Sequence, residues 1–358
     1  MATYSAKSIT FTLCLLLSAC STSTPPSSSV NIIRISAVGD IMLGGTAEPV
    51  LDEHGYDYPF EKVNHLLLSS DIVIGNLEGP LTTSDTPYST DKLYLFKTPP
   101  DKVAPALKKA GFTIMNLANN HILDYGMAGL KDTQRALENN NLNYLGADIN
   151  LQQARQGIII KAKDYKIGFL SYSLTFPQTF WATSTTPGTA FGHEHEIRAD
   201  VRRLKQITDF VVVSFHWGRE KSTELREYQP LLAHAAIDEG ASFIIGHHPH
   251  VLQAIEEYKH GIILYSLGNF TFGSYSQESA TSAIATLSLQ NGTISKLEIH
   301  PIDVLNINVN FQPLPLTEEK AKAVIDQINL LSRNTNTQLV HYQNTGTLSK
   351  SESVAIKH

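Results

Sequence analysis

The sequence predicts a layered α/β domain with two central sheets. Strand and helix patterns alternate from residue 31 to about residue 245, the order typical of parallel strands joined by helices. Runs such as Asp-Ile-Val-Ile and Phe-Val-Val-Val are apolar on both faces, as expected of strands covered by helices on one side and by another sheet on the other. Beyond Gly261 the strand patterns follow each other without long helices.

The expected elements can be placed in order along the chain. A β-branched run at residues 31–39 opens the domain as its first strand. A hairpin is expected around Asp164, and Asn291-Gly292 is a strong signal for a type I′ turn between two further strands. The predicted helices cover residues 60–68, 100–110, 126–140, 194–207, 229–239 and 317–331, and the predicted strands include 71–75, 112–117, 158–161, 166–173, 210–215 and 242–245.

Length and charge limit the classes of protein that fit. The chain has 358 residues, 42% of them hydrophobic, enough for one large domain of about 250–300 residues with a short tail at either end. Its net charge of −6 gives no electrostatic reason to expect a nucleic-acid partner. No apolar run beyond the N-terminus reaches about 18 residues, so no membrane-spanning helix is expected in the rest of the chain.

The N-terminus has the pattern of a secretory signal. A weakly basic start containing Lys7 is followed by a short apolar stretch at residues 11–17 and by Leu17-Ser18-Ala19-Cys20. This ending resembles a bacterial lipobox, which implies a lipoprotein signal peptide at residues 1–19 and lipid on Cys20. An ordinary signal peptide with a chance cysteine is the alternative. Residues 20–30, rich in Ser, Thr and Pro, are expected to form a disordered tether.

The predicted location follows from the same segment. An exported, lipid-anchored protein would face the periplasm, and by resemblance to Gram-negative sorting patterns Ser21, in place of Asp, weakly favours the outer membrane. The chain contains only Cys14 and Cys20, and Cys14 lies in the segment that would be removed. No internal disulfide or cysteine-metal site is therefore expected, so any metal must be bound by His, Asp, Glu or Asn.

Five polar clusters directly follow predicted strands. In open α/β sheets, ligands bind beyond the carboxyl ends of the strands, so this placement predicts one functional site. Singly, each cluster has a simpler interpretation: Gly-Asp forms turns, Asn-Asn-His caps helices, and a lone histidine packs in a core. Three histidines within residues 247–250 are harder to explain that way, because His-x-His after a strand points two imidazoles toward one centre. The clusters are Gly39-Asp40-Ile41-Met42, Gly75-Asn76-Leu77-Glu78, Asn119-Asn120-His121, His216-Trp217-Gly218 and Gly246-His247-His248-Pro249-His250.

Six motifs in order carry a family resemblance across roughly residues 31–300. The chain resembles the CapA/PgsA family of poly-γ-glutamate capsule synthesis, which is related to calcineurin-like metallophosphoesterases. The resemblance implies a four-layer αββα sandwich with a metal site at the strand ends. The motifs are Gly-Asp-Ile-Met-Leu, Gly-Asn-Leu-Glu, Ala-Asn-Asn-His-Ile-Leu-Asp-Tyr-Gly, His-Trp-Gly-Arg-Glu, Gly-His-His-Pro-His-Val-Leu-Gln and Tyr-Ser-Leu-Gly-Asn-Phe.

The resemblance also implies roles for particular residues. His121 matches the histidine that protonates a leaving group, whereas Asn76, His247 and Asn269 are expected behind the ligands. Met42 stands where a ligand histidine is usual and Asn76 where the metal-bridging aspartate is usual, so Glu78 is the expected substitute. We expect one firmly bound divalent ion (Mn, Zn or Fe) and a second that is weak or absent. The implied metal ligands are Asp40, Glu78, Asn120, His216, His248 and His250.

The implied function is the synthesis, release or handling of an extracellular anionic polymer, poly-γ-glutamate or a capsule-like relative, by metal-assisted hydrolysis or transfer. The expected partners are this polymer or a peptide-like substrate, the membrane, and membrane proteins of polymer synthesis or export. Two alternatives remain: a non-catalytic polymer-binding or assembly factor with a degenerate metal site, and a periplasmic phosphoesterase. Residues 31–312 are expected to form the family domain, and residues 313–358 a C-terminal helix with a loose tail from Ser332.

Overall fold

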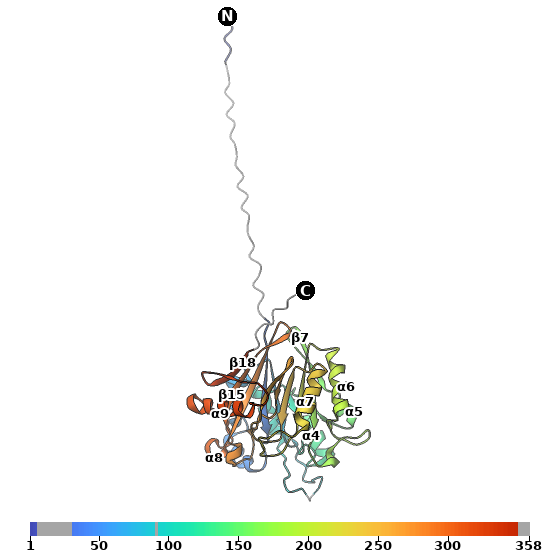
Figure 1. Cartoon of the computed structure of the whole chain (residues 1–358). Coiled ribbons are helices and arrows are strands. Elements are labelled where there is room, and N and C mark those ends of the chain that lie inside the picture. Colours follow the sequence, from blue (N-terminus) through green and yellow to red (C-terminus); the bar gives the residue numbers. More distant parts are fainter. Residues whose placement is uncertain (6–30, 90–91, 350–358) are drawn as a thin grey trace. The chain divides into compact units, whose positions relative to one another are not determined.

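The computed structural model of the protein describes residues 1–5, 31–89 and 92–349 (Figure 1). The chain divides into two units, Met1–Val30 and Asn31–His358. The first is described only at residues 1–5, which are exposed and without regular secondary structure. Cys20, the tether and most of the expected signal peptide therefore lie outside the described residues. Within the described ranges, no helix is both long enough and apolar enough to cross a membrane.

The first sheet has ten strands and is parallel from β1 to β4. Strand β1 (Ile33–Ile41) pairs in parallel with β2 (Ile72–Leu77) and in antiparallel with β14 (Thr281–Gln290). The order is β17, β18, β15, β14, β1, β2, β3, β4, and β13 and β16 pair with β1 and β15. The other strands are β3 (Ile114–Asn116), β4 (Asn143–Leu145), β13 (Asn269–Thr271), β15 (Thr293–Asp303), β16 (Leu314–Pro315), β17 (Val340–Tyr342) and β18 (Thr345–Ser349).

The second sheet has six strands in the order β11, β12, β10, β9, β7, β6. Strands β7, β9, β10 and β12 are parallel, and β6 and β11 pair in antiparallel at the two edges. A separate two-stranded sheet joins β5 (Ala147–Asp148) to β8 (Gly188–Thr189). The strands of the second sheet are β6 (Ile158–Ala162), β7 (Tyr165–Ser173), β9 (Phe210–His216), β10 (Phe243–His247), β11 (Ile255–Tyr258) and β12 (Gly261–Leu264).

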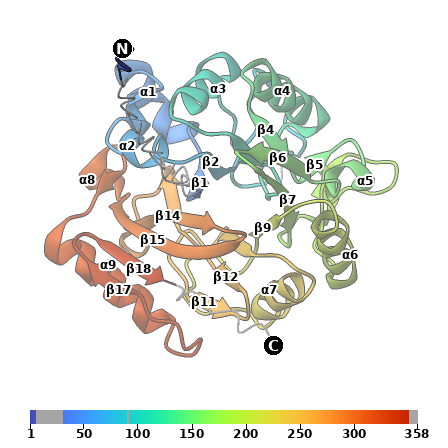
Figure 2. The same cartoon turned by 90° about the horizontal axis from the view of Figure 1, so that it is seen from above.

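Helices cover the outer faces of both sheets. In Figure 2, α1 to α4 lie along one side of the molecule, and α7 lies on the opposite side. The helix expected at residues 60–68 is reduced to α2, preceded by a 3-10 turn at Tyr58–Phe60. The helices are α1 (Glu48–His54), α2 (Asn64–Leu67), α3 (Pro100–Lys109), α4 (Gly126–Asn139), α5 (Leu151–Ala154), α6 (Glu194–Lys205), α7 (Tyr228–Asp238), α8 (Asn306–Val309) and α9 (Glu318–Leu331).

Three apolar cores separate the layers, as the alternation of side chains along the strands requires. In β9, Val212 belongs to the core between the two sheets, whereas Val211 and Val213 belong to the core under α6 and α7. In β2, Ile74 faces the second sheet and Val73 faces the helices α1 to α4. The predicted layered fold with two sheets is therefore confirmed, with the order helix, sheet, sheet, helix.

The C-terminal segment differs from the expected loose tail. Side chains of α9 join the core between the two sheets, and β18 pairs with β15. The polar residues that indicated a loose segment bond instead to the edge strand β11: the backbone N–H groups of Ile255 and Glu257 donate to Ser332 Oγ and Thr337 Oγ1, both at 2.8 Å. The expectation is wrong for residues 332–349, because these hydroxyls cover a sheet edge. The boundary at residue 312 stays a prediction.

Two neighbouring residues of this segment provide a test. Leu339 is 3% exposed within the core between the sheets, whereas Val340 is 66% exposed on β17. We expect Leu339→Ala to lower the free energy of unfolding by about 2–5 kcal/mol, because it removes buried methyl groups and leaves a cavity. Val340→Ala should change it by about 0.5 kcal/mol or less. Urea denaturation measures both, and equal effects would contradict the packed arrangement.

Candidate metal centre

The five predicted clusters meet at one end of the two sheets. Asp40 and Asn76 are paired in register on β1 and β2, and His216 and His247 are paired on β9 and β10. All four strands therefore end with their polar residues at the same level. Across the gap between the sheets, the backbone N–H of His248 donates to Asp40 Oδ2 at 3.2 Å. One carboxylate thus contacts both sheets.

Two glycines permit this close approach of the strands. A Cβ at Gly39 would lie 2.0 Å from the carbonyl oxygen of Gly268, and one at Gly246 would lie 1.9 Å from that of Tyr265. Both distances are far below van der Waals contact with rigid backbone, so only glycine fits there. This explains physically why glycine precedes both Asp40 and His247.

Two groups of side chains have the spacing of metal ligands. Glu78, His248 and His250 form one group, and Asp40, Glu78 and His216 form the other, with ligand atoms within 4.8 Å of each other in each group. Asp40, Glu78 and His216 are fully buried. Glu78 belongs to both groups, which is the position expected of a residue that replaces the bridging aspartate.

Asn76 acts here as a hydrogen-bond donor. Its Nδ2 donates to Asp40 Oδ1 at 2.8 Å and to Glu78 Oε2 at 3.2 Å. The orientation of its amide is fixed from the other side, because its Oδ1 accepts from Asn116 Nδ2 and Asn119 Nδ2, both at 3.0 Å. Asn76 therefore holds the two carboxylates side by side from behind, and its oxygen points away from them.

Two further amides contact the imidazoles. Asn120 Oδ1 lies 2.7 Å from His216 Nε2, so it is next to the group that contains Asp40. Asn269 Oδ1 lies 2.9 Å from His250 Nδ1, which leaves His250 Nε2 directed to the side of Glu78, 3.8 Å from its Oε1. Hydrogen bonds of this kind orient a ligand ring and fix its tautomer.

The two carboxylates have opposite pKa shifts. Burial raises the pKa of Glu78, and the charge of Asp40 raises it further, to well above its usual range. Burial also raises the pKa of Asp40, but the imidazoles of His247 and His250, 3.4 Å and 3.1 Å from its oxygens, outweigh it and hold that pKa well below the usual range. The site thus holds the two carboxylates in different electrostatic surroundings, and a bound cation would offset the charge of both.

The histidines divide in the same way. Burial lowers the pKa of His248 to about 3, with a further contribution from the charge of His250, and burial lowers the pKa of His216 well below its usual range. Burial also lowers the pKa of His250, but Glu78 and Asp40 outweigh it and raise this pKa to about 9. His216 and His248 are therefore neutral at neutral pH, the form that binds metal ions.

Unpaired buried atoms test whether these residues fit a cation. Among the described residues, Glu78 Oε1, His248 Nδ1, Asn269 Nδ2 and both ring nitrogens of His247 are buried without a hydrogen-bond partner. Each such group costs about 1–3 kcal/mol unless it is compensated. A divalent cation bound by Glu78 and His248 would compensate two of them, and mixed oxygen and imidazole donors suit Zn, Mn and Fe. The residues present therefore fit a metal ion.

The backbone at the His-x-His motif is strained in a way that serves this geometry. His248 and His250 have φ angles of +93° and +58°, a region that non-glycine residues rarely adopt. Met42 Sδ accepts from the backbone N–H of Gly44 at 3.3 Å.

His121 lies beside the centre in a hydrogen-bonded pair. Its Nδ1 is 2.8 Å from Asp124 Oδ2, and Asp124 is fully buried. The ammonium of Lys92 contacts Asp124 Oδ1 and the carbonyl oxygen of Asn120, and it lies 3.0 Å from His121 Nδ1. Burial lowers the pKa of His121, and Asp124 partly offsets the effect. With Nδ1 bonded to Asp124, Nε2 is the nitrogen left to exchange a proton.

Sequence reasoning did not assign Lys92 a role and gave Asp124 none beyond its motif. The spacing of His121 and Asp124, i and i+3 after a strand, was the available signal for their pairing. Lys92 carries no such signal, because it reaches the site from a long segment between β2 and α3 that has no motif of its own. Trp217 is buried, and its Nε1 donates to the carbonyl oxygen of Tyr265 at 2.9 Å.

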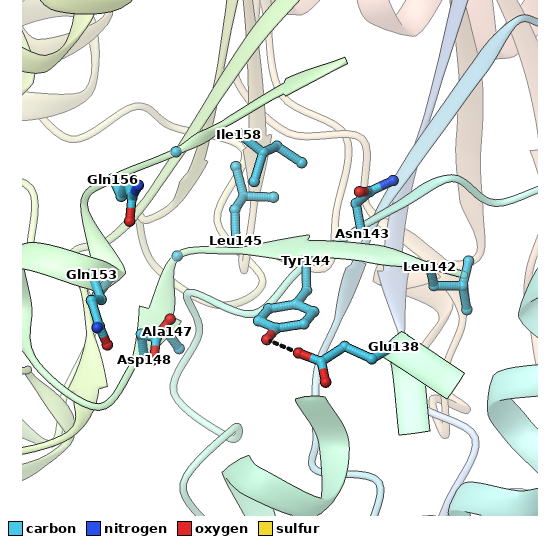
Figure 3. Close-up of a pocket in the computed structure, with 13 residues that line it drawn as sticks. Glu138, Leu142, Asn143, Tyr144, Leu145, Ala147, Asp148, Gln153, Gln156 and Ile158 are labelled. Atoms are coloured by element: carbon cyan, nitrogen blue, oxygen red, sulfur yellow. Dashed lines mark hydrogen bonds between the residues drawn. The ribbon is translucent and has the colours of Figure 1, made fainter. Parts of the chain in front are cut away.

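A cavity of about 360 Å³ lies elsewhere, between the edge strands β4 and β6 (Figure 3). Leu145 and Ile158 line it from the two strands, and Tyr144 OH donates to Glu138 Oε1 at 2.6 Å. Burial, with the nearby Glu138, raises the pKa of Tyr144. None of the predicted site residues lines this cavity, so it is separate from the candidate metal centre.

Together, the layers and the buried His, Asp and Glu cluster define a layered α/β protein with a candidate metal site at the strand ends. The structure is similar to the calcineurin-like phosphoesterase YfkN from Bacillus subtilis, with a TM-score of 0.44 and 15% sequence identity over 86% of this chain and 98% of that chain.

The chain belongs to the family described as "Bacterial capsule synthesis protein PGA_cap", which matches residues 34–274. It is 34% identical over 277 residues to "Capsule biosynthesis protein CapA" of Bacillus anthracis, covering 76% of this chain and 67% of that protein. It is also 34% identical over 303 residues to "PGA biosynthesis protein CapA" of Bacillus subtilis (strain 168), covering 84% and 78%. The family resemblance read from the motifs is confirmed.

Removing the charge of Glu78 tests the ligand assignment. We expect Glu78→Gln to bind metal at least about tenfold more weakly, because the shared carboxylate is lost while size and hydrogen bonding are kept. Elemental analysis of folded protein measures metal content. Glu220→Gln is the matched control, since it removes a nearby exposed charge and neither ligand group contains it. Full occupancy in Glu78→Gln would contradict the assignment.

Proposed function

We propose that this protein acts in the synthesis, release or handling of poly-γ-glutamate or a related anionic extracellular polymer, by metal-assisted hydrolysis or transfer. Family membership supports the polymer, through the capsule names of the two Bacillus relatives. One observation carries the chemistry: the cluster that fits a metal ion lies next to the His121–Asp124 pair, through the contact of Asn120 with His216.

In this proposal the chain's own residues divide the work. The residues that would hold one or two divalent ions are Asp40, Glu78, Asn120, His216, His248 and His250. A bound ion would supply Lewis-acid polarisation of the carbonyl and a water of lowered pKa. For a γ-glutamyl amide, the water oxygen joins the carbonyl carbon and its released proton passes to Nε2 of the neutral His121. The C–N bond then breaks, and His121 Nε2 gives this proton to the leaving nitrogen. Asp124 holds the imidazole by its Nδ1 during that transfer.

A second candidate is a non-catalytic polymer-binding or assembly factor. The observation that favours it is the role of Asn76, which donates to both carboxylates where an anionic bridging ligand would stand in a metallophosphoesterase. Such a site would retain one ion as a structural or polymer-binding feature. The catalytic proposal, in contrast, requires Glu78 to supply the negative charge of the ligand that bridges two ions.

Turnover assays distinguish the candidates. With Mn²⁺ or Zn²⁺, we expect purified protein to shorten poly-γ-glutamate, and His121→Ala to lose about 10²- to 10⁴-fold in rate while keeping its metal, because only the proton donor is removed. His195→Ala, an exposed histidine at the start of α6, is the control. Binding of polymer without turnover would support the assembly factor. Turnover of phosphodiesters alone would support a phosphoesterase.

We also propose that the protein is exported and held at the membrane by lipid on Cys20, with its domain on the periplasmic side and the outer membrane favoured. The Leu-Ser-Ala-Cys ending and the Ser, Thr and Pro segment behind it support this. An anchored domain would work next to membrane proteins that make or export the polymer, which are the partners we propose.

Metabolic labelling with a fatty-acid analogue tests the anchor. We expect label on the wild-type protein and on Cys14→Ala, because Cys14 would leave with the signal peptide. We expect no label on Cys20→Ala, because that change removes the residue that carries the lipid. Gel fluorescence after immunoprecipitation gives the result. An unlabelled wild-type protein would show that the segment is an ordinary signal peptide.

A further inference from the structure

The segment from Leu81 to Thr98, here called the strap, crosses between β2 and α3 next to the candidate metal centre. It is described at residues 81–89 and 92–98. Its two ends meet, because Leu81 and Thr98 form an isolated bridge and Thr82 N–H donates to the carbonyl oxygen of Thr98 at 3.0 Å. The strap is therefore a loop closed on itself at its base.

The strap is fixed to the candidate site by Asp124. The backbone N–H of Phe96 donates to Asp124 Oδ2 and that of Tyr88 to the carbonyl oxygen of Asp124, both at 2.8 Å. The ammonium of Lys92 contacts Asp124 Oδ1. The same carboxylate holds His121. One buried aspartate thus sets the position of the strap relative to the proposed proton donor.

Aromatic rings run from the strap to both sides of the centre. The Phe96 ring lies 4.3 Å from the ring of His121 and 6.1 Å from that of Phe272, and the Phe272 ring lies 4.6 Å from that of His250. On the outer side, Tyr94 stacks on Phe96 at 6.4 Å with an interplanar angle of 22°. The rings form a continuous wall from a ring exposed to solvent to the buried centre.

The strap carries several apolar side chains that are exposed to solvent. Tyr88 is 52% exposed, Leu93 84% and Tyr94 64%, and all three lie on the strap. Single exposed apolar side chains are ordinary, but several gathered on one segment beside a candidate active site indicate a binding surface. Within the domain, the described residues hold only one other tyrosine as exposed as Tyr94: Tyr342 on β17.

The charges of the strap are already paired within the protein. Of its described residues only Asp85, Lys92 and Lys97 are charged, and Lys97 Nζ lies 2.6 Å from Asp85 Oδ1 while Lys92 pairs with Asp124. The hydrogen bonds of Lys92 go to Asp124, Asn120 and His121. These ammonium groups therefore have little left to offer carboxylates of a polymer, and the exposed rings are the available contact.

We propose that Tyr94 and Phe96 form a subsite for the polymer chain, next to the position where His121 acts. The inference rests on the proposed function and deepens it. A γ-linked glutamate chain has two methylene groups and a planar amide in each repeat, and both pack on aromatic faces. The strap binds these apolar parts of the chain, while the carboxylates remain in water. Its contribution to affinity is therefore insensitive to salt, unlike that of a basic groove.

Binding of end-labelled γ-glutamate oligomers, a dimer and a decamer, tests the subsite by fluorescence anisotropy. The metal-loaded full chain is compared with Tyr94→Ala and with Tyr342→Ala, a control that removes an equally exposed tyrosine from β17. We expect Tyr94→Ala to weaken decamer binding about tenfold, at low and at high salt, and to leave dimer binding unchanged, because the ring acts beyond the reactive centre. Tyr342→Ala should match the wild type.

Two checks separate the outcomes. Melting temperature and metal content of Tyr94→Ala should equal those of the wild type, and Phe96→Leu should show an intermediate loss, since it keeps apolar volume without a ring. If the wild type binds the decamer and Tyr94→Ala binds it equally well, or if the loss disappears at high salt, the subsite is overturned and the proposed function stands. If the wild type binds neither oligomer, the proposed function falls together with the subsite.

Discussion

The candidate site depends on holding two buried carboxylates, Asp40 and Glu78, next to each other. Because both side chains are buried, the repulsion between the two carboxylates is large. The structure offsets this repulsion, since the amide of Asn76 donates to both carboxylates and the surrounding histidines contribute hydrogen bonds or positive charge. These partners come from the ends of several strands: Asn76 from β2, His216 from β9, and His247 and His250 from β10 and the turn after it. The positions of the strand ends are therefore constrained by the charges that they bring together.

This constraint extends into the backbone. The strands can end at one level only because Gly39 and Gly246 have no Cβ, and the neighbouring backbone segments occupy the space that a Cβ would need. The positive φ angles of His248 and His250 belong to the same arrangement, since these two imidazoles form one ligand group with Glu78. The large apolar cores on both sides of the two sheets provide the stability that offsets such local strain.

Much of this arrangement is predictable from sequence, for identifiable reasons. Buried parallel strands have apolar runs, and polar clusters after such runs lie at the carboxyl ends of the strands, so the clusters that contain Asp40, Glu78 and His216 could be assigned to one site in advance. The roles of Lys92 and Phe96 could not, because the strap has no periodicity and its position is set by hydrogen bonds to Asp124 far along the chain. The segment after Ser332 was misjudged because its hydroxyls bond to a strand edge, which composition alone does not show.

The charges of the ligand groups bear on how many ions the centre can hold. The two groups share Glu78, so together they contain only two carboxylates, Asp40 and Glu78, against four positive charges for two divalent ions. One ion is nearly balanced by these two anions, whereas a second would leave a net positive centre in a region that disfavours uncompensated charge. An anionic group of a substrate would remove that excess. We therefore propose one resident ion, with a second bound only together with an anionic group of the substrate.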